Sequence, residues 1–148
     1  MIYIHYDPAD GEILNAYDEN CKNIPQPNIA VTDEENRQIH MHWKKKGKVI
    51  DGKLTLVDIP MTVADFDKVM EEYLTETRVA RGYTTREPTD YLNSEQARWK
   101  QDAADWIAFR DAVMLYVLDL MNTYESLGKI PTLDEFKAGL PKIKWNAE

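Results

Sequence analysis

The chain has 148 residues, 43% hydrophobic and 30% charged, a balance typical of a globular protein with enough apolar residues for a core. The 18 basic and 26 acidic residues give a formal net charge of −8, which disfavours general binding to a phosphate backbone, since that binding depends on Lys and Arg. No run of about 18 apolar residues occurs, and the start lacks the basic, apolar pattern of a signal peptide, so we expect neither a membrane span nor export. The single cysteine, Cys21, excludes an internal disulfide.

Residues 1–59 are predicted to form a small β-rich domain with the order β-β-α-β-β. Its first hairpin joins residues 1–6 to residues 12–17 through Asp10-Gly11, a dipeptide that favours tight hairpin turns. The last hairpin joins residues 48–50 to residues 54–57 through a second dipeptide of the same kind, Asp51-Gly52. Both pairs of strands are therefore expected to be antiparallel.

The segment between these hairpins is predicted to contain a loop and one helix. Residues 20–28 carry two prolines and indicate an extended loop. Thr32 and Glu35 have the spacing of a capping box, which predicts a helix from Thr32 to about Lys45 that ends before Gly47. The lysine cluster 44–46, with Lys48, is then expected to complement the negative end of that helix.

Residues 60–148 are predicted to form a helical domain, so the whole chain is expected to be α+β. Thr62 caps a helix that ends near Gly82, and residues 82–93 form a connection. Ser94 is the expected cap of a long helix over residues 94–127, where neither Gly nor Pro interrupts the chain. Thr132 begins a short last helix.

The long helix is the strongest candidate for a binding element, because at about 1.5 Å per residue it exceeds the width of a domain of this size. Apolar residues recur at every seventh position in two neighbouring rows, as in a coiled-coil or bundle seam, and Arg110 interrupts the resulting stripe. We expect Arg110 to pair with a carboxylate, and Asp102, Asp105 and Asp111 to form a salt-bridged surface. The predicted partner-binding residues are Trp99, Trp106, Phe109, Arg110, Val113, Tyr116, Val117 and Leu120.

Residue patterns typical of enzymes are scarce. The sequence contains no nucleophile elbow, phosphate-binding glycine loop or paired-cysteine motif. His40 and His42 diverge by about 200° on a helix, so they do not suit one metal ion unless that segment is extended. We therefore predict no catalytic residue, no metal and no cofactor.

Several short motifs resemble those of small bacteriophage tail-fibre assembly and tail-associated proteins. The N-terminal motifs are YDPADGEI at Tyr6–Ile13, VTDEE at Val31–Glu35 and GKVIDGK at Gly47–Lys53. The C-terminal motifs are ARGY at Ala80–Tyr83, DWIAFRDAV at Asp105–Val113 and IPTLDEF at Ile130–Phe136, followed by Leu140-Pro141 and Trp145. Phe109 stands where the family pattern has Trp.

The resemblance implies a structural or binding task in the phage tail rather than catalysis. The protein would bind a tail-fibre or baseplate protein, as a fibre-assembly chaperone or as a virion adaptor, and not nucleic acid or a membrane. It would act in the host cytoplasm during assembly and could remain in the virion tail. It could also form a homo-oligomer through the long helix. The alternative function is that of an acidic, phage-encoded inhibitor of a host protein.

Overall fold

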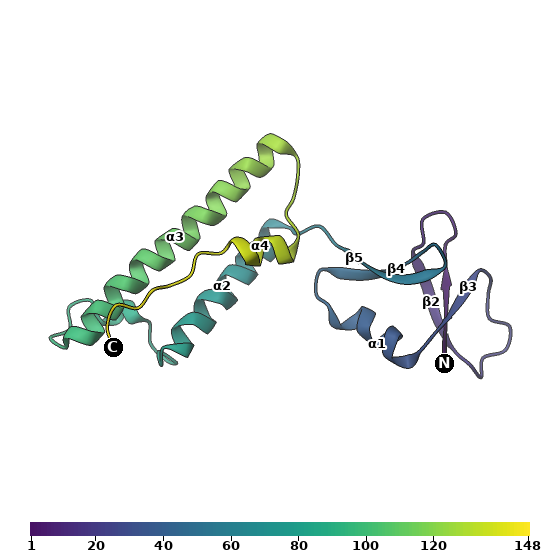
Figure 1. The fold of residues 1–148 in the computed structure, drawn as a ribbon, viewed down its shortest axis with the longest axis horizontal. Helices are drawn as coiled ribbons and strands as arrows, with labels where there is room; N and C mark the ends of the chain where they lie inside the picture. The colour runs from purple at the N-terminus through teal and green to yellow at the C-terminus, as the bar shows by residue number, and fades with distance from the viewer. The chain divides into compact units, whose positions relative to one another are not determined.

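The computed structural model describes residues 1–148, which divide into two compact units, Met1–Pro60 and Met61–Glu148. Figure 1 shows strands and one short helix in the first unit, and helices in the second. The predicted α+β class is confirmed. The predicted domain boundary, between residues 59 and 60, lies one residue before the division between the units.

The first unit contains a three-stranded and a two-stranded antiparallel sheet. The three-stranded sheet has the order β2-β1-β3, formed by β1 (Ile2–Tyr6), β2 (Ile13–Asp18) and β3 (Asn28–Val31). The second sheet pairs β4 (Lys45–Ile50) with β5 (Lys53–Asp58). Both predicted hairpins are confirmed. Asp51 and Gly52 have φ angles of 51° and 73°, the left-handed backbone that two-residue hairpin turns require.

The prediction missed strand β3. Its four residues follow the two prolines and pair with β1, where the prediction placed the end of a loop and assigned no element to residues 29–31. Ile29 and Val31 thereby join Ile4 in the core of the unit. A segment this short has too few residues for apolar alternation to reveal it.

The predicted helix in the first unit begins correctly but ends too late. α1 covers Asp33–Met41, and Thr32 and Glu35 form the predicted capping box. The chain then turns, and Lys45 and Lys46 lie in β4 rather than at a helix end, so their predicted role at the negative helix end is wrong. Gly47 does not stop the helix either. It is buried in β4, where a Cβ atom would lie 2.9 Å from Ile13 Cδ1.

The second unit contains α2 (Val63–Ala80), a 3₁₀ turn η1 (Pro88–Tyr91), α3 (Ala97–Leu127) and α4 (Leu133–Gly139). Thr62 caps α2 as predicted, together with Asp65. α3 begins three residues later than predicted, because the Ser94 hydroxyl accepts from the Gln96 amide at 3.1 Å and does not cap the helix. Its 31 residues span about 46 Å, and Gly128 ends it with φ 62°. No helix is long and apolar enough to span a membrane.

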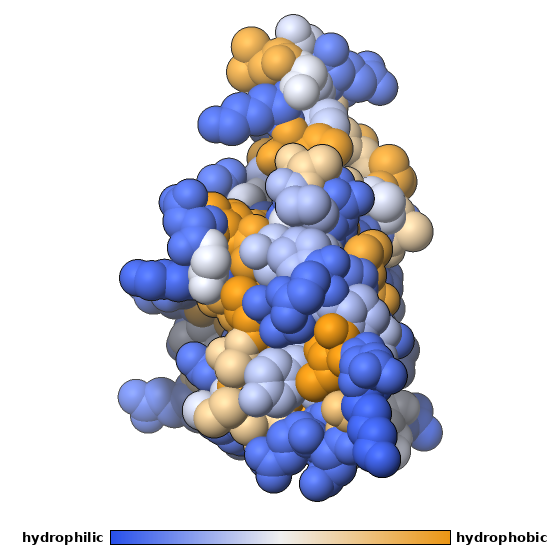
Figure 2. Space-filling view, turned by 90° about the vertical axis from the view of Figure 1, so that its right-hand side faces the viewer, coloured by the Kyte–Doolittle hydropathy of each residue, from blue (hydrophilic) through white to orange (hydrophobic).

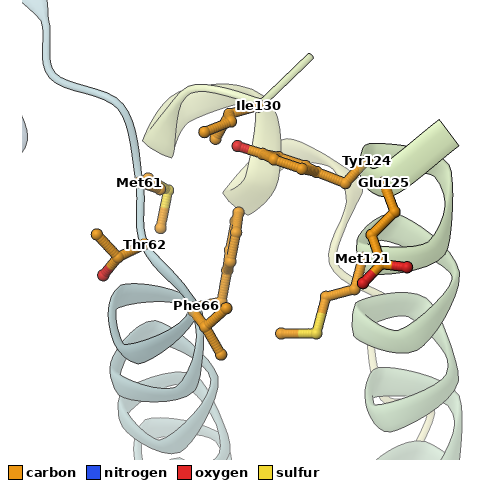
Figure 3. Close-up of a pocket in the computed structure, with 8 residues that line it drawn as sticks. Met61, Thr62, Phe66, Met121, Tyr124, Glu125 and Ile130 are labelled. Atoms are coloured by element: carbon orange, nitrogen blue, oxygen red, sulfur yellow. The ribbon is translucent and has the colours of Figure 1, made fainter. Parts of the chain in front are cut away.

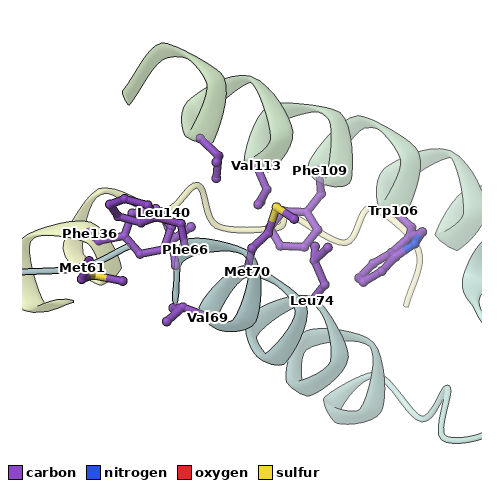
Figure 4. Packing of buried hydrophobic residues seen from close by; sticks show 11 residues of the cluster. Met61, Phe66, Val69, Met70, Leu74, Trp106, Phe109, Val113, Phe136 and Leu140 are labelled. Atoms are coloured by element: carbon purple, nitrogen blue, oxygen red, sulfur yellow. The ribbon is translucent and has the colours of Figure 1, made fainter. Parts of the chain in front are cut away.

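The core of the second unit is formed by α2, α3, α4 and the C-terminal tail. Figure 1 shows α4 and the tail running beside α2 and α3, and Figure 4 shows side chains from these elements meeting in one cluster. The Phe136 ring of α4 lies 4.8 Å from that of Phe66 and 5.7 Å from that of Tyr116. The Trp145 ring of the tail stacks on Trp106 at 6.4 Å. The tail is therefore part of the hydrophobic core.

Candidate partner-binding surfaces

The core covers half of the residues that were predicted to bind a partner. Trp106, Phe109, Val113 and Val117 are buried, with exposed fractions of at most 6%. They face α2, α4 and the tail of their own unit, as Figure 4 shows for the first three. The predicted seam exists, but this chain itself covers most of it, so these four side chains are not accessible to a partner.

The other four predicted residues have different surroundings. Tyr116 and Leu120 are partly buried against the same core, and the Tyr116 hydroxyl donates to the Phe136 carbonyl at 3.0 Å. Trp99 is 45% exposed. Arg110 is partly buried and forms no ion pair, so the predicted carboxylate partner is absent.

α3 presents a second apolar surface on the side away from its core. Met114, Leu115 and Leu118 are 44%, 60% and 52% exposed. Their spacing of one, three and four residues places them on one face of the helix. Asp111 and Glu125 lie on the same face, four and seven residues away, and neither forms an ion pair. We call these five residues the outer face of α3.

An apolar pocket lies beside the C-terminal end of the outer face (Figure 3). Its volume is about 310 Å³, and its lining comes from the start of α2, the end of α3 and the segment before α4: Met61, Thr62, Val63, Phe66, Met121, Tyr124, Glu125 and Ile130. Figure 3 shows Tyr124 reaching from α3 toward Ile130. Its hydroxyl is buried without a hydrogen bond, and burial raises the pKa of Tyr124. Glu125 belongs to both the pocket and the outer face, so the two surfaces are continuous.

The face of the molecule in Figure 2 carries hydrophobic residues in small groups separated by hydrophilic ones. Small apolar groups of this kind are normal on protein surfaces. This view therefore adds no third apolar surface to the outer face and the pocket.

Two aspartates of α3, Asp102 and Asp105, are buried and accept hydrogen bonds from other segments of the second unit. They are not surface residues, contrary to the prediction. Asp102 is 1% exposed, and it accepts from Arg81 Nη2 at 2.8 Å, Arg81 Nε at 3.1 Å and the Tyr83 hydroxyl at 2.8 Å. Arg81 Nη2 also donates to the Ala147 carbonyl. The pair thus connects α2, α3 and the tail.

Asp105, one turn later, binds the tail directly. Its carboxylate accepts from the backbone N and the Nδ2 of Asn146, both at 2.7 Å, and from Gln101 Nε2 at 2.9 Å. Burial opposes the charged form, but these hydrogen bonds outweigh it and hold the pKa of Asp105 below its ordinary value. Because both aspartates are fully engaged within the fold, their arrangement is structural.

The remaining candidates do not form a reactive cluster. No group of three or more His, Cys, Asp or Glu side chains has the arrangement of a metal site. Cys21 is exposed, and His40 and His42 are exposed at the end of α1. No protein-family model, curated protein or solved structure matches this chain.

Sequence reasoning missed the outer face and the pocket for a recognisable reason. Residues 112–121 are apolar on nearly every side, so periodicity alone does not distinguish the covered face from the exposed one. The two acidic residues, Asp111 and Glu125, mark the exposed side. They are the signal from which the outer face could have been found.

Proposed function

We propose that this protein is a bacteriophage tail-associated binding protein without catalytic activity, which binds a tail-fibre or baseplate protein. The N-terminal and C-terminal sequence motifs support this proposal, because they resemble motifs of phage tail-associated proteins. The partner is either a fibre protein that is being assembled or a neighbouring protein in the finished tail. In the first case the chain is an assembly chaperone, and in the second it is an adaptor.

The observation that carries the proposal is the outer face of α3. Three large apolar side chains are exposed there side by side, and an exposed apolar surface of this kind marks a binding region more often than scattered single residues do. The neighbouring pocket can accept an apolar side chain of the partner.

The charges on this surface indicate the chemistry of the partner. Neither Asp111 nor Glu125 forms an ion pair within the chain, and a second copy of the outer face would bring further acidic groups toward them. A partner segment with apolar residues flanked by Lys or Arg would bury the leucines and neutralise both carboxylates. The outer face therefore suits a basic amphipathic partner better than a homodimer.

Affinity capture of the tagged full chain from its native lysate tests the proposal. We expect the chain to recover a tail-fibre or baseplate protein, and the double variant Leu115→Asp/Leu118→Asp to lose it. Leu14→Asp is the control, since Leu14 is exposed to a similar degree, 58%, but lies in β2. Equal recovery by the two variants would contradict a role of the outer face. The presence of the protein in washed phage particles would distinguish an adaptor from a chaperone.

A specific feature of α2 favours the alternative of an acidic inhibitor. Glu71, Glu72 and Glu76 are exposed together on that helix, in a chain of net charge −8. Under this hypothesis the chain captures a basic host protein, and the triple variant Glu71→Gln/Glu72→Gln/Glu76→Gln weakens the complex. Raising the salt concentration would also weaken it, because screening acts most strongly on exposed charges. Capture of a tail protein that survives high salt would reject this alternative.

A further inference from the structure

A second pocket, unlike the apolar one, lies where α2 ends and α3 begins. Its volume is about 210 Å³, and it is lined by Arg81, Gly82, Tyr83, Tyr91, Arg98 and Trp99. The lining contains two arginines and three aromatic side chains but no carboxylate. Both charged side chains of the lining are therefore basic, in a chain with a net charge of −8. We call it the arginine–aromatic pocket.

Three aromatic rings of the arginine–aromatic pocket contact one another in a row. The Tyr91 ring lies between the other two, 5.8 Å from Tyr83 and 5.3 Å from Trp99, with interplanar angles of 55° and 52°. Trp99, at the end of the row, is 45% exposed, which leaves part of its ring free to contact a ligand. The row therefore offers an apolar surface on which a further ring can pack.

The internal hydrogen bonds of the chain leave donors of Arg81 and Arg98 free. Asp102 and the Ala147 carbonyl occupy Nε and Nη2 of Arg81, while its Nη1 makes no hydrogen bond. Arg98 is exposed and has no ion-pair partner. The buried ion pair thus holds one guanidinium in place, and the second is free to bind an anion.

The nearby charges limit what anion fits. Asp102 faces Arg81 and Tyr83, and Asp105 also acts on Arg81 electrostatically. Asp102 neutralises Arg81, and Arg98 is the one arginine of the lining without an ion pair, which favours a ligand of a single negative charge over a dianion such as phosphate. Burial and the hydrogen bond to Asp102 raise the pKa of Tyr83 to about 12, so Tyr83 adds no charge at neutral pH.

The dimensions of the pocket limit the size of the ligand. Drug-sized ligands occupy pockets of about 300–1,000 Å³, and this one is smaller. Gly82 has φ 107°, and no atom lies within 4 Å of the Cβ that another residue would have there, so its side of the pocket is open. There is room for one ring and one small charged group.

We propose that the arginine–aromatic pocket binds a single aromatic carboxylate, with its ring against Trp99 and its carboxylate on Arg98. The free C-terminus of a chain that ends in an aromatic residue would supply this chemistry, and so would a free aromatic acid. This site lies apart from the outer face of α3, so it does not depend on the tail-protein proposal.

The test is a titration of the full chain with N-acetyl-phenylalanine and with its neutral amide, followed by the ¹H–¹⁵N signals of the tryptophan indoles. The variant Trp99→Phe identifies the Trp99 signal. We expect the acid to shift that signal saturably and the amide to bind at least about fivefold more weakly, because it lacks the charge. We expect the Arg98→Gln variant to bind N-acetyl-phenylalanine more weakly than the unmodified chain does, by a similar factor. Arg110→Gln removes the same charge elsewhere on α3 and should have no effect.

Two peptides ending in phenylalanine, one with a free C-terminus and one amidated, distinguish the two sources. If the free peptide binds more tightly than N-acetyl-phenylalanine, the ligand is the C-terminus of another chain, and equal affinity indicates a free acid. The proposal fails if the Trp99 signal does not move at millimolar acid, if the amide binds equally well, or if Arg98→Gln changes nothing. Arg98 has no partner in the fold, and an unchanged thermal melt of the variant would verify that its fold is intact.

Discussion

At the scale of single residues, the most constrained groups are the two buried aspartates of α3. Asp102 is opposite Arg81, whose side chain is 18% exposed, and Asp105 holds the tail at Asn146. Removing one member of a buried ion pair leaves an uncompensated charge, which costs much more than losing a surface pair. These residues therefore decide whether the tail stays on the core.

For this reason we expect Asp102→Asn to lower the free energy of unfolding of the second unit by about 3 kcal/mol. Asp111→Asn, an exposed aspartate of the same helix without a partner, should change it by less than about 0.5 kcal/mol. Urea unfolding followed by tryptophan fluorescence measures both. Similar values for the two variants would show that Asp102 does not stabilise the fold.

Asp105 makes stability depend on pH. The pKa of Asp105 is lower in the folded chain than the ordinary value of 3.8. Its carboxylate therefore contributes fully to the free energy of unfolding above pH 3.8, and this contribution is lost as the pH falls through the folded pKa. We expect the second unit to lose stability below pH 3.8, and Asp105→Asn to make that loss smaller. Urea midpoints at pH 7 and pH 3 measure this difference. An unchanged pH dependence in the variant would assign acid sensitivity to other carboxylates.

At the scale of elements, the two faces of α3 should respond differently to the loss of side-chain volume. Val113 is fully buried between α2 and α4, and Leu115 is 60% exposed on the outer face. We expect Val113→Ala to cost about 2 kcal/mol through lost burial and a cavity, and Leu115→Ala less than about 0.5 kcal/mol. Chemical unfolding compares them. A large cost at Leu115 would mean that the outer face supports the fold rather than a partner.

Element boundaries show how far the sequence predicts this fold. Local chemistry correctly predicted the caps at Thr32 and Thr62 and the turn at Asp51-Gly52, because each depends on neighbouring residues alone. The end of α1 is set by the pairing of β4 with β5, which overrides the helix propensity of consecutive lysines. Strand β3 depends on pairing with β1, more than twenty residues earlier in the chain.

The candidate sites were harder to predict than the fold. The sequence correctly predicted the heptad-spaced apolar stripe of α3. It does not say what covers this stripe, which is α4 and Trp145 of the same chain and not another protein. The arginine–aromatic pocket joins residues of α2, η1 and α3 through tertiary packing, so no local spacing reveals it. Local patterns therefore predict elements well and composite sites poorly.

At the scale of the whole molecule, the two units differ in that the C-terminal tail, residues 141–148, packs on the second unit. The Tyr73 hydroxyl donates to the Pro141 carbonyl at 2.6 Å, in addition to the contacts of the tail with Arg81, Asp105 and Trp106 described above. Three of the four tryptophans lie in that unit, and Trp43 lies in the first. The chain therefore contains its own reporter for each unit.

Deleting residues 141–148 should accordingly destabilise one unit and leave the other unchanged. The deletion removes the Trp145 ring from Trp106 and leaves Arg81 and Asp105 without their tail partners, so we expect a loss of several kcal/mol in the second unit. The Trp43 indole signal and the midpoint of its loss in urea should stay as in the full chain. If Trp43 and Trp106 lose their native signals together in both chains, the units unfold as one cooperative body, and the expected difference between them would be wrong.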